Sequence, residues 1–147
     1  HYNKKHTLIL NKQNIKIMII STIKGFELDI RIEADCESID FYNTDGNLEA
    51  SFTAEPYDYV LDIKVEDVRI SKQREGIYTE IINTILFNDT FHDLLKSEFE
   101  EIETASFTSS LRSEQACNFW TKRGYEVSYN ETEHQNGEQE LIEINLF

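Results

Sequence analysis

Residues 70–82 read Ile-Ser-Lys-Gln-Arg-Glu-Gly-Ile-Tyr-Thr-Glu-Ile-Ile, and within this stretch the spacing of the apolar residues changes. Before it, apolar and polar residues alternate, which is typical of strands with one buried face. After Gly76, apolar residues recur at intervals that place them on one face of a helix. We therefore expect a strand to end and a helix to begin here, with a basic turn between them.

The sequence before this stretch predicts a series of antiparallel strands. Apolar and charged residues alternate in four runs, two of which flank Asp45-Gly46. Asp-Gly between alternating runs favours the tight turn of a hairpin. The expected strands are residues 26–34, 38–42, 48–54 and 59–70.

The sequence after Gly76 predicts helices followed by a closing hairpin. The apolar spacing indicates a helix that starts at Gly76. Residues 90–93, Thr-Phe-His-Asp, resemble a capping box that opens a short second helix ending near Phe99. The turn Asn136-Gly137 is typical of a hairpin. The other expected elements are a strand at 102–108, a helix at 113–123 ended by Gly124, and hairpin strands at 125–129 and 140–147.

Together these elements predict one α+β domain over residues 1–147, with a core at 26–147 and a basic N-terminal extension or strand at 1–25. Because helices connect the strand at 59–70 to the strand at 102–108, we expect these two strands to lie side by side and parallel. The remaining strand pairs are expected to be antiparallel. A mixed sheet of this kind leaves a cleft where the two parallel strands part.

Charge is distributed unevenly along the chain. The sequence holds 14 basic and 28 acidic residues, a net charge of −14. Residues 1–25 hold five Lys and no acidic residue, so residues 26–147 hold 9 basic against 28 acidic residues, a net charge of −19. Non-specific binding of nucleic acid needs a broad basic face, which this composition does not supply. The charge favours cationic partners instead.

Nothing in the sequence indicates a membrane partner or a metal site. The apolar run at 15–23 is too short to span a bilayer and contains Lys16. The four His residues are scattered and form no group with ligand spacing. We expect a cytoplasmic protein without a metal.

The basic turn has two possible roles. Lys72 and Arg74 lie at the entrance to a helix, where the helix dipole favours an anion, and Gly76 lets the backbone approach a ligand closely. These features suit a phosphate or pyrophosphate. Alternatively, the turn is a surface feature that complements acidic neighbours such as Glu66 and Asp67.

Three motifs resemble the GNAT superfamily of N-acetyltransferases. Residues 73–78, Gln-Arg-Glu-Gly-Ile-Tyr, are similar to the family signature Gln/Arg-x-x-Gly-x-Gly/Ala, whose amides hold the pyrophosphate of acetyl-coenzyme A. Residues 45–50 look like the family's second hairpin. Residues 116–125 look like its late helix motif, Ala-x-x-Phe-Tyr-x-x-x-Gly-Phe. The resemblance covers residues 26–147 and implies a GNAT-like twisted sheet with acetyl-CoA as cosubstrate.

The resemblance also implies the cofactor contacts, with three departures from the family pattern. Tyr78 stands where the family has Gly or Ala, and Trp120 replaces the Tyr that many members use as general acid. Trp120 is therefore assigned to the core or to a wall for the pantetheine arm. The two amphipathic helices that usually wall the acceptor site are reduced here. The implied contacts are Val68, Lys72, Gln73, Arg74, Glu75, Gly76, Ile77, Tyr78, Phe119, Trp120 and Lys122.

An acetyltransferase must also remove a proton from its amine, whose pKa is about 10.4 when it is lysine-like. Alignment with the family strand makes Asp62 the first candidate base and Glu66 the second. Alternatively, Asp62 is an ion-pair partner of Lys64 or of a cation on a neighbouring strand. A distortion of the strand near residues 66–68 would turn a backbone N–H toward the thioester carbonyl. Tyr125 or water would protonate the departing thiolate.

The sequence thus predicts an acetyl-CoA-dependent N-acetyltransferase that acts on a primary amine of a cationic small molecule or protein. The alternative is a GNAT-fold module without catalysis, which binds acyl-CoA or covers a basic surface of another protein. The strand at 140–147 and the Lys-rich start could each pair with a second copy at a sheet edge, which would give a homodimer.

Overall fold

The computed structural model describes residues 4–12, 15–22, 25, 27–69, 76–111, 113–127 and 141–147. Contacts within the chain form two compact units, and each is described by itself. The first comprises His1–Phe107 with Asn145–Phe147, and the second comprises Thr108–Ile144. The expectation of a single domain stays a prediction.

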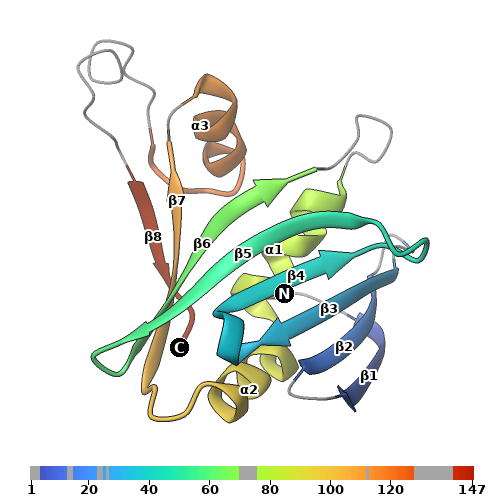
Figure 1. The fold of residues 1–147 in the computed structure, drawn as a ribbon. Helices are drawn as coiled ribbons and strands as arrows, with labels where there is room; N and C mark the ends of the chain where they lie inside the picture. Colours follow the sequence, from blue (N-terminus) through green and yellow to red (C-terminus); the bar gives the residue numbers. More distant parts are fainter. Residues whose placement is uncertain are drawn as a thin grey trace. The chain divides into compact units, whose positions relative to one another are not determined.

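The described elements follow the expected order of a strand meander, two helices, a strand, a helix and a strand (Figure 1). The strands are β1 Lys4–Lys12, β2 Ile15–Thr22, β3 Glu27–Glu33, β4 Ser38–Tyr42, β5 Leu48–Tyr57, β6 Val60–Val68, β7 Thr104–Ser110 and β8 Leu141–Asn145. The helices are the short 3-10 turn η1 Ala34–Cys36, and α1 Ile77–Phe87, α2 Asp89–Glu98 and α3 Glu114–Thr121.

The strands lie in the sheet in chain order, from β1 to β8. Each neighbouring pair from β1 to β6 is antiparallel. The carbonyl oxygen of Tyr59, just before β6, accepts hydrogen bonds from the backbone N–H groups of Glu103 (2.7 Å) and Thr104 (3.3 Å) at the start of β7. These two strands therefore begin side by side, as the expected parallel junction requires. The α+β class and the mostly antiparallel sheet are confirmed.

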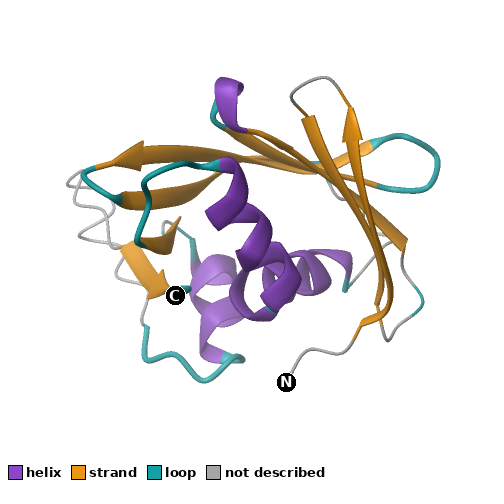
Figure 2. Ribbon diagram, turned by 90° about the horizontal axis from the view of Figure 1, so that it is seen from below, coloured by secondary structure: helices purple, strands orange, loops and turns teal. Residues whose placement is uncertain are grey.

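The core of the first unit lies between one face of the sheet and helices α1 and α2 (Figure 2). Alternate residues of β3 to β6 are fully buried on this face because side chains of a strand alternate between its two sides. The Phe41 ring packs against Phe52 (centroids 5.6 Å apart) and against Phe91 of α2 (6.4 Å), and Phe52 packs against Phe107 (6.0 Å). These aromatic contacts join four elements of the unit.

The turn between β4 and β5 is held by one side chain. The Asn43 Oδ1 atom accepts hydrogen bonds from the backbone N–H groups of Asp45 (2.9 Å) and Asn47 (3.0 Å), and Asn43 Nδ2 donates to the buried carboxylate of Glu49 (2.8 Å). Gly46 supplies the left-handed backbone with φ +81° that the turn needs. The expected Asp-Gly hairpin is confirmed, and this turn fixes which residues of β4 and β5 face each other.

The second helix does not begin as the sequence predicts. Asn88, not Thr90, is its N-cap, since the Asn88 backbone is extended and its Oδ1 atom accepts a hydrogen bond from the Phe91 N–H (2.9 Å). The capping box at Thr90 is therefore wrong. Asn88 takes this place because α1 ends at Phe87 and the next residue must leave the helical conformation.

Two strand boundaries near the C-terminus also differ from expectation. Strand β7 begins at Thr104 rather than at Ile102, and Glu101, just before the expected start, has a left-handed backbone (φ +68°). Residues 125–127 form no strand. The remainder of that expected strand and the Asn136-Gly137 turn lie outside the described residues.

The capping contact gives the first prediction. Asn88→Ala removes the acceptor for the Phe91 N–H at a buried helix start, so the free energy of unfolding should fall by about 1–2 kcal/mol. Thr90→Ala, at the position that the sequence favoured, should cost less. Urea denaturation of both variants measures the difference. A larger loss for Thr90→Ala would show that the helix begins where the sequence, not the structure, places it.

Candidate functional site

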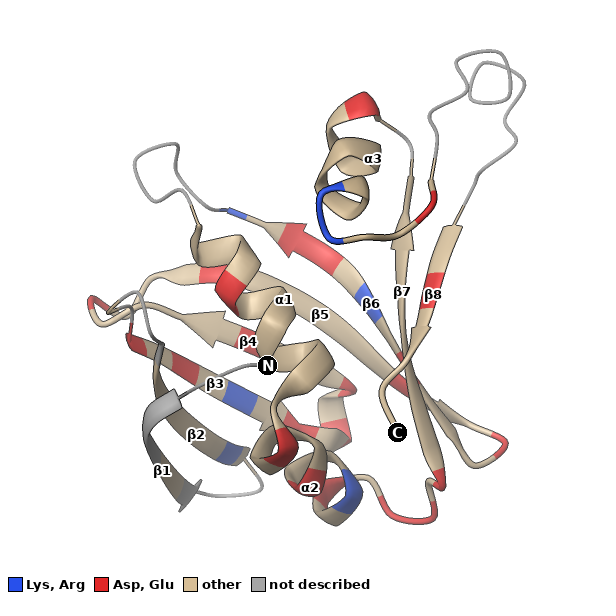
Figure 3. Ribbon diagram, turned by 180° about the vertical axis from the view of Figure 1, so that it is seen from behind, with Lys and Arg blue, Asp and Glu red and all other residues tan. Residues whose placement is uncertain are grey.

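The face of the sheet opposite α1 and α2 carries a continuous set of polar side chains from four strands. Cross-strand pairing places Arg31 opposite Asp40 and Asp40 opposite Ser51. The acidic positions on β3 and β6 are visible in Figure 3. We call this set the polar face: Asp29, Arg31, Asp40, Tyr42, Ser51, Asp62, Lys64 and Glu66.

Strand β6 contains a β-bulge at Glu66. Ser51 pairs with Asp67 and the next residue, Phe52, pairs with Val65, so Glu66 is an extra residue with no partner in the β5 register. A bulge bends its strand and turns a backbone group out of the regular ladder. The bulge lies where the sequence analysis expects a distortion, within residues 66–68.

The bulge brings Glu66 close to two polar side chains of the neighbouring strands. The Ser51 hydroxyl donates a hydrogen bond to Asp40 Oδ1 (2.6 Å), and the same Oγ atom lies 3.4 Å from Glu66 Oε2. Burial raises the pKa of Asp40 above its ordinary value, and repulsion from Glu33 and Glu66 acts in the same direction. The Ser51 hydrogen bond and the charge of Arg31 oppose this rise in pKa.

The other candidate base, Asp62, lies in a different part of the polar face. Its Oδ2 atom is 3.2 Å from Lys64 Nζ, so the alternative role of Asp62 as an ion-pair partner of Lys64 is observed. Asp62 precedes Glu66 by four residues, about 13 Å along an extended strand. The structure therefore separates the two candidate bases and brings only Glu66 to the bulge.

Helix α1 begins soon after the basic residues Lys72 and Arg74 in the sequence. Gly76 is its N-cap, has a left-handed backbone with φ +92° and makes no side-chain cap hydrogen bond. Ile77 is fully buried in the core, Tyr78 is half-buried, and Val68 at the end of β6 is exposed. Four of the expected cofactor contacts lie outside the described residues: Lys72, Gln73, Arg74 and Glu75.

The late helix motif belongs to the second unit, where α3 and the residues after it form an aromatic cluster. Trp120 is 2% exposed and packs edge-on against Phe119 (centroids 5.2 Å apart) and Tyr125 (5.6 Å). The guanidinium of Arg123 stacks on the Phe119 ring at 3.3 Å from its centroid. Lys122, the helix C-cap, is exposed. Trp120 therefore lies in the core of this unit, which is one of the two roles expected for it, and its contact with the pantetheine arm stays a prediction.

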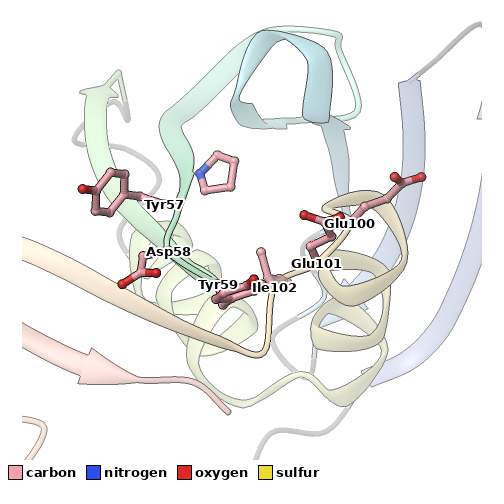
Figure 4. A pocket seen from close by; sticks show the side chains of 7 residues that line it. Tyr57, Asp58, Tyr59, Glu100, Glu101 and Ile102 are labelled. Atoms are coloured by element: carbon pink, nitrogen blue, oxygen red, sulfur yellow. The ribbon is translucent and has the colours of Figure 1, made fainter.

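A hollow of about 450 Å³ lies at the start of β6, away from the bulge. In Figure 4, Tyr59 and Ile102 lie close together in it, whereas the Tyr57 ring points outward. Asp58 and Glu101 add acidic groups to its lining. The start of β6 is six residues from Glu66, about 20 Å along a strand, so this hollow is separate from the polar cluster at the bulge.

Sequence reasoning did not find Asp40 and Ser51. Their alternating positions place them on the polar side of β4 and β5, but only the register of the hairpin shows that they face each other. The contact of Ser51 Oγ with Glu66 Oε2 shows that Glu66 lies beside them. Among the described residues, no three His, Cys, Asp or Glu side chains gather as a metal site would need. None of the described helices is long and apolar enough to cross a membrane.

Comparisons with family models, with curated proteins and with solved structures found no match for this chain. The candidate site therefore stands on its own geometry and on the motifs in the sequence.

The raised pKa of Asp40 gives the second prediction. Because folding disfavours the charged carboxylate, the wild type should lose stability as pH rises through the raised pKa, and this cost is absent below the ordinary value of 3.8. Asp40→Asn keeps the acceptor for Ser51 but carries no charge. Its stability relative to the wild type should rise between pH 4 and pH 8 in urea denaturation.

The control for this experiment is Asp62→Asn, which removes one negative charge from the same face while breaking an ion pair. If both variants showed the same dependence on pH, the effect at Asp40 would reflect net charge alone, not its local surroundings.

Proposed function

We propose that this chain is a divergent GNAT-superfamily N-acetyltransferase that transfers the acetyl group of acetyl-CoA to a primary amine of a cationic small molecule or protein. The proposal rests mainly on the order of two structural features at the end of β6. A bulge at Glu66 is followed, ten residues later, by the left-handed Gly76 that opens α1. Residues 73–78, which resemble the family's pyrophosphate-binding signature, include this glycine.

The N-terminus of α1 supports a role for this region in binding an anion. The positive end of a helix dipole favours a phosphate, and Gly76 places no side chain between the backbone and a ligand. Ile77 is buried, so only its backbone could contribute to binding. Tyr78, where the family has Gly or Ala, would lie next to the pyrophosphate and narrow its site.

The bulge supports the chemical step. A thioester carbonyl gains negative charge when an amine attacks it, and a backbone N–H turned out of the ladder stabilises that charge. Glu66 lies at the same place and is the nearer of the two candidate bases. Asp62 would help to attract a cationic acceptor along the polar face. Acid–base assistance of this kind typically contributes about 10²–10⁴-fold to the rate.

Calorimetric titration with acetyl-CoA tests the proposal. The wild type should bind with a Kd in the micromolar range, and Gly76→Glu should weaken binding at least tenfold, because a carboxylate at the helix start repels pyrophosphate. The control is Gly46→Glu, which adds the same charge at another left-handed glycine, with φ +81°. Equal affinities of the two variants would refute the pyrophosphate site.

Turnover distinguishes the enzyme from the alternative module. Incubation with acetyl-CoA and a panel of primary amines should release free coenzyme A in proportion to acetylated amine. Binding of acetyl-CoA without transfer to any amine or basic protein would instead support the acyl-CoA-binding module. The net charge of −19 over residues 26–147 favours a cationic amine acceptor if the chain is an enzyme, and a basic protein partner if it is a binding module.

A further inference from the structure

We propose that Asp40 and Ser51 extend Glu66 into a hydrogen-bonded relay that accepts the proton of the acceptor ammonium group. This inference rests on the proposed acetyltransferase activity. Glu66 would be the base that meets the amine. Asp40, which acts through Ser51, is a positioning residue that holds the proton on β4, two strands away from the bulge on β6.

The direction of the relay follows from the hydroxyl geometry. A serine hydroxyl has one hydrogen, and the shorter contact, 2.6 Å to Asp40 Oδ1, takes it. The Ser51 oxygen then offers a lone pair toward Glu66 Oε2, 3.4 Å away. When Glu66 gains a proton, it can donate to Ser51 Oγ while Ser51 donates to Asp40. The three side chains are therefore ordered for transfer from β6 through β5 to β4.

The charges that face Asp40 make it a suitable end of the relay. Burial disfavours the charged form of Asp40 most, and Glu33 on β3 and Glu66 on β6 also repel its carboxylate, so protonation of Asp40 removes an unfavourable negative charge. Arg31 on β3 is the cation that opposes protonation. Arg31 is also engaged elsewhere, since it lies 3.6 Å from Asp29 and stacks over the Tyr42 ring at 4.1 Å.

Two protons leave the acceptor ammonium group during the reaction, and each has a destination. The ammonium group gives one proton to Glu66, and Ser51 passes a proton on to Asp40, which leaves a neutral amine. The amine nitrogen bonds to the acetyl carbon, and the carbon–sulfur bond breaks. The second proton of the attacking nitrogen goes to the departing thiolate. Asp40 then releases its proton to solvent, so the products are an amide, free coenzyme A and one proton.

Titration of side-chain carboxyl ¹³C shifts tests the relay without any need for activity. Glu66→Gln removes a repulsive charge and should lower the titration midpoint of Asp40, whereas Ser51→Ala removes a hydrogen bond to the charged form and should raise it. Ser51→Thr keeps the hydroxyl and should restore the wild-type midpoint. If neither Glu66→Gln nor Ser51→Ala changed the titration midpoint of Asp40, the inference would be wrong.

Kinetics then test whether the relay serves the reaction. Asp40→Asn and Ser51→Ala should each lower kcat at least tenfold, with KM unchanged, and should shift the acidic limb of the pH profile, while Ser51→Thr should retain the wild-type profile. Binding of acetyl-CoA to all three variants should stay unchanged. Unaltered kcat and pH profiles in an active enzyme would refute the relay.

Failure of the proposed acetyltransferase function can be told apart from failure of the relay. If the wild type binds no acetyl-CoA and acetylates no amine, the proposed function fails. The role of the relay in catalysis then fails with it. The carboxyl titration still decides whether Asp40, Ser51 and Glu66 are coupled.

Discussion

The pairing of β5 with β6 is the constraint on which the rest of the structure depends. These two long strands fix the register for both faces of the sheet, since Phe52 and Ile63 reach the aromatic core while Ser51 and Lys64 point to the polar face. The bulge at Glu66 changes that register by one residue just before the chain leaves the sheet. Without the extra residue, the last side chains of β6 would exchange faces.

Much of the fold could be predicted because local patterns decide it. The alternation of apolar and polar residues in 27–33 predicts which side chains of that strand are buried, and the change of spacing at Gly76 predicts where a helix begins. Asp45-Gly46 predicts a tight turn, because few other residue pairs adopt its backbone conformation. The start of α2 could not be predicted because Asn88 and Thr90 are both good caps. The choice depends on where α1 stops, which is set by packing of its apolar face.

The candidate site was less predictable than the fold. Gly76 stands out in the sequence because it ends a basic stretch and begins a helical pattern, and Glu66 is the second candidate base by alignment with the family strand. Asp40 and Ser51 carry no such signal, because they are ordinary polar positions of strands, and their contact depends on pairing between residues eleven apart. A cross-strand cluster of this kind is visible only once the register is known.

Strand β1 has a consequence for the behaviour of the protein in solution. It is the first strand of the sheet. Two consecutive residues within it, Leu8 and Ile9, point to opposite faces, and their exposed fractions are 44% and 45%. Lys4, Lys5 and Lys12 bracket this apolar centre. Like charges at both ends of an edge strand disfavour edge-to-edge pairing of two copies, which acts against a homodimer formed through this strand. Salt screens that repulsion, so colloidal stability should depend on ionic strength through this strand.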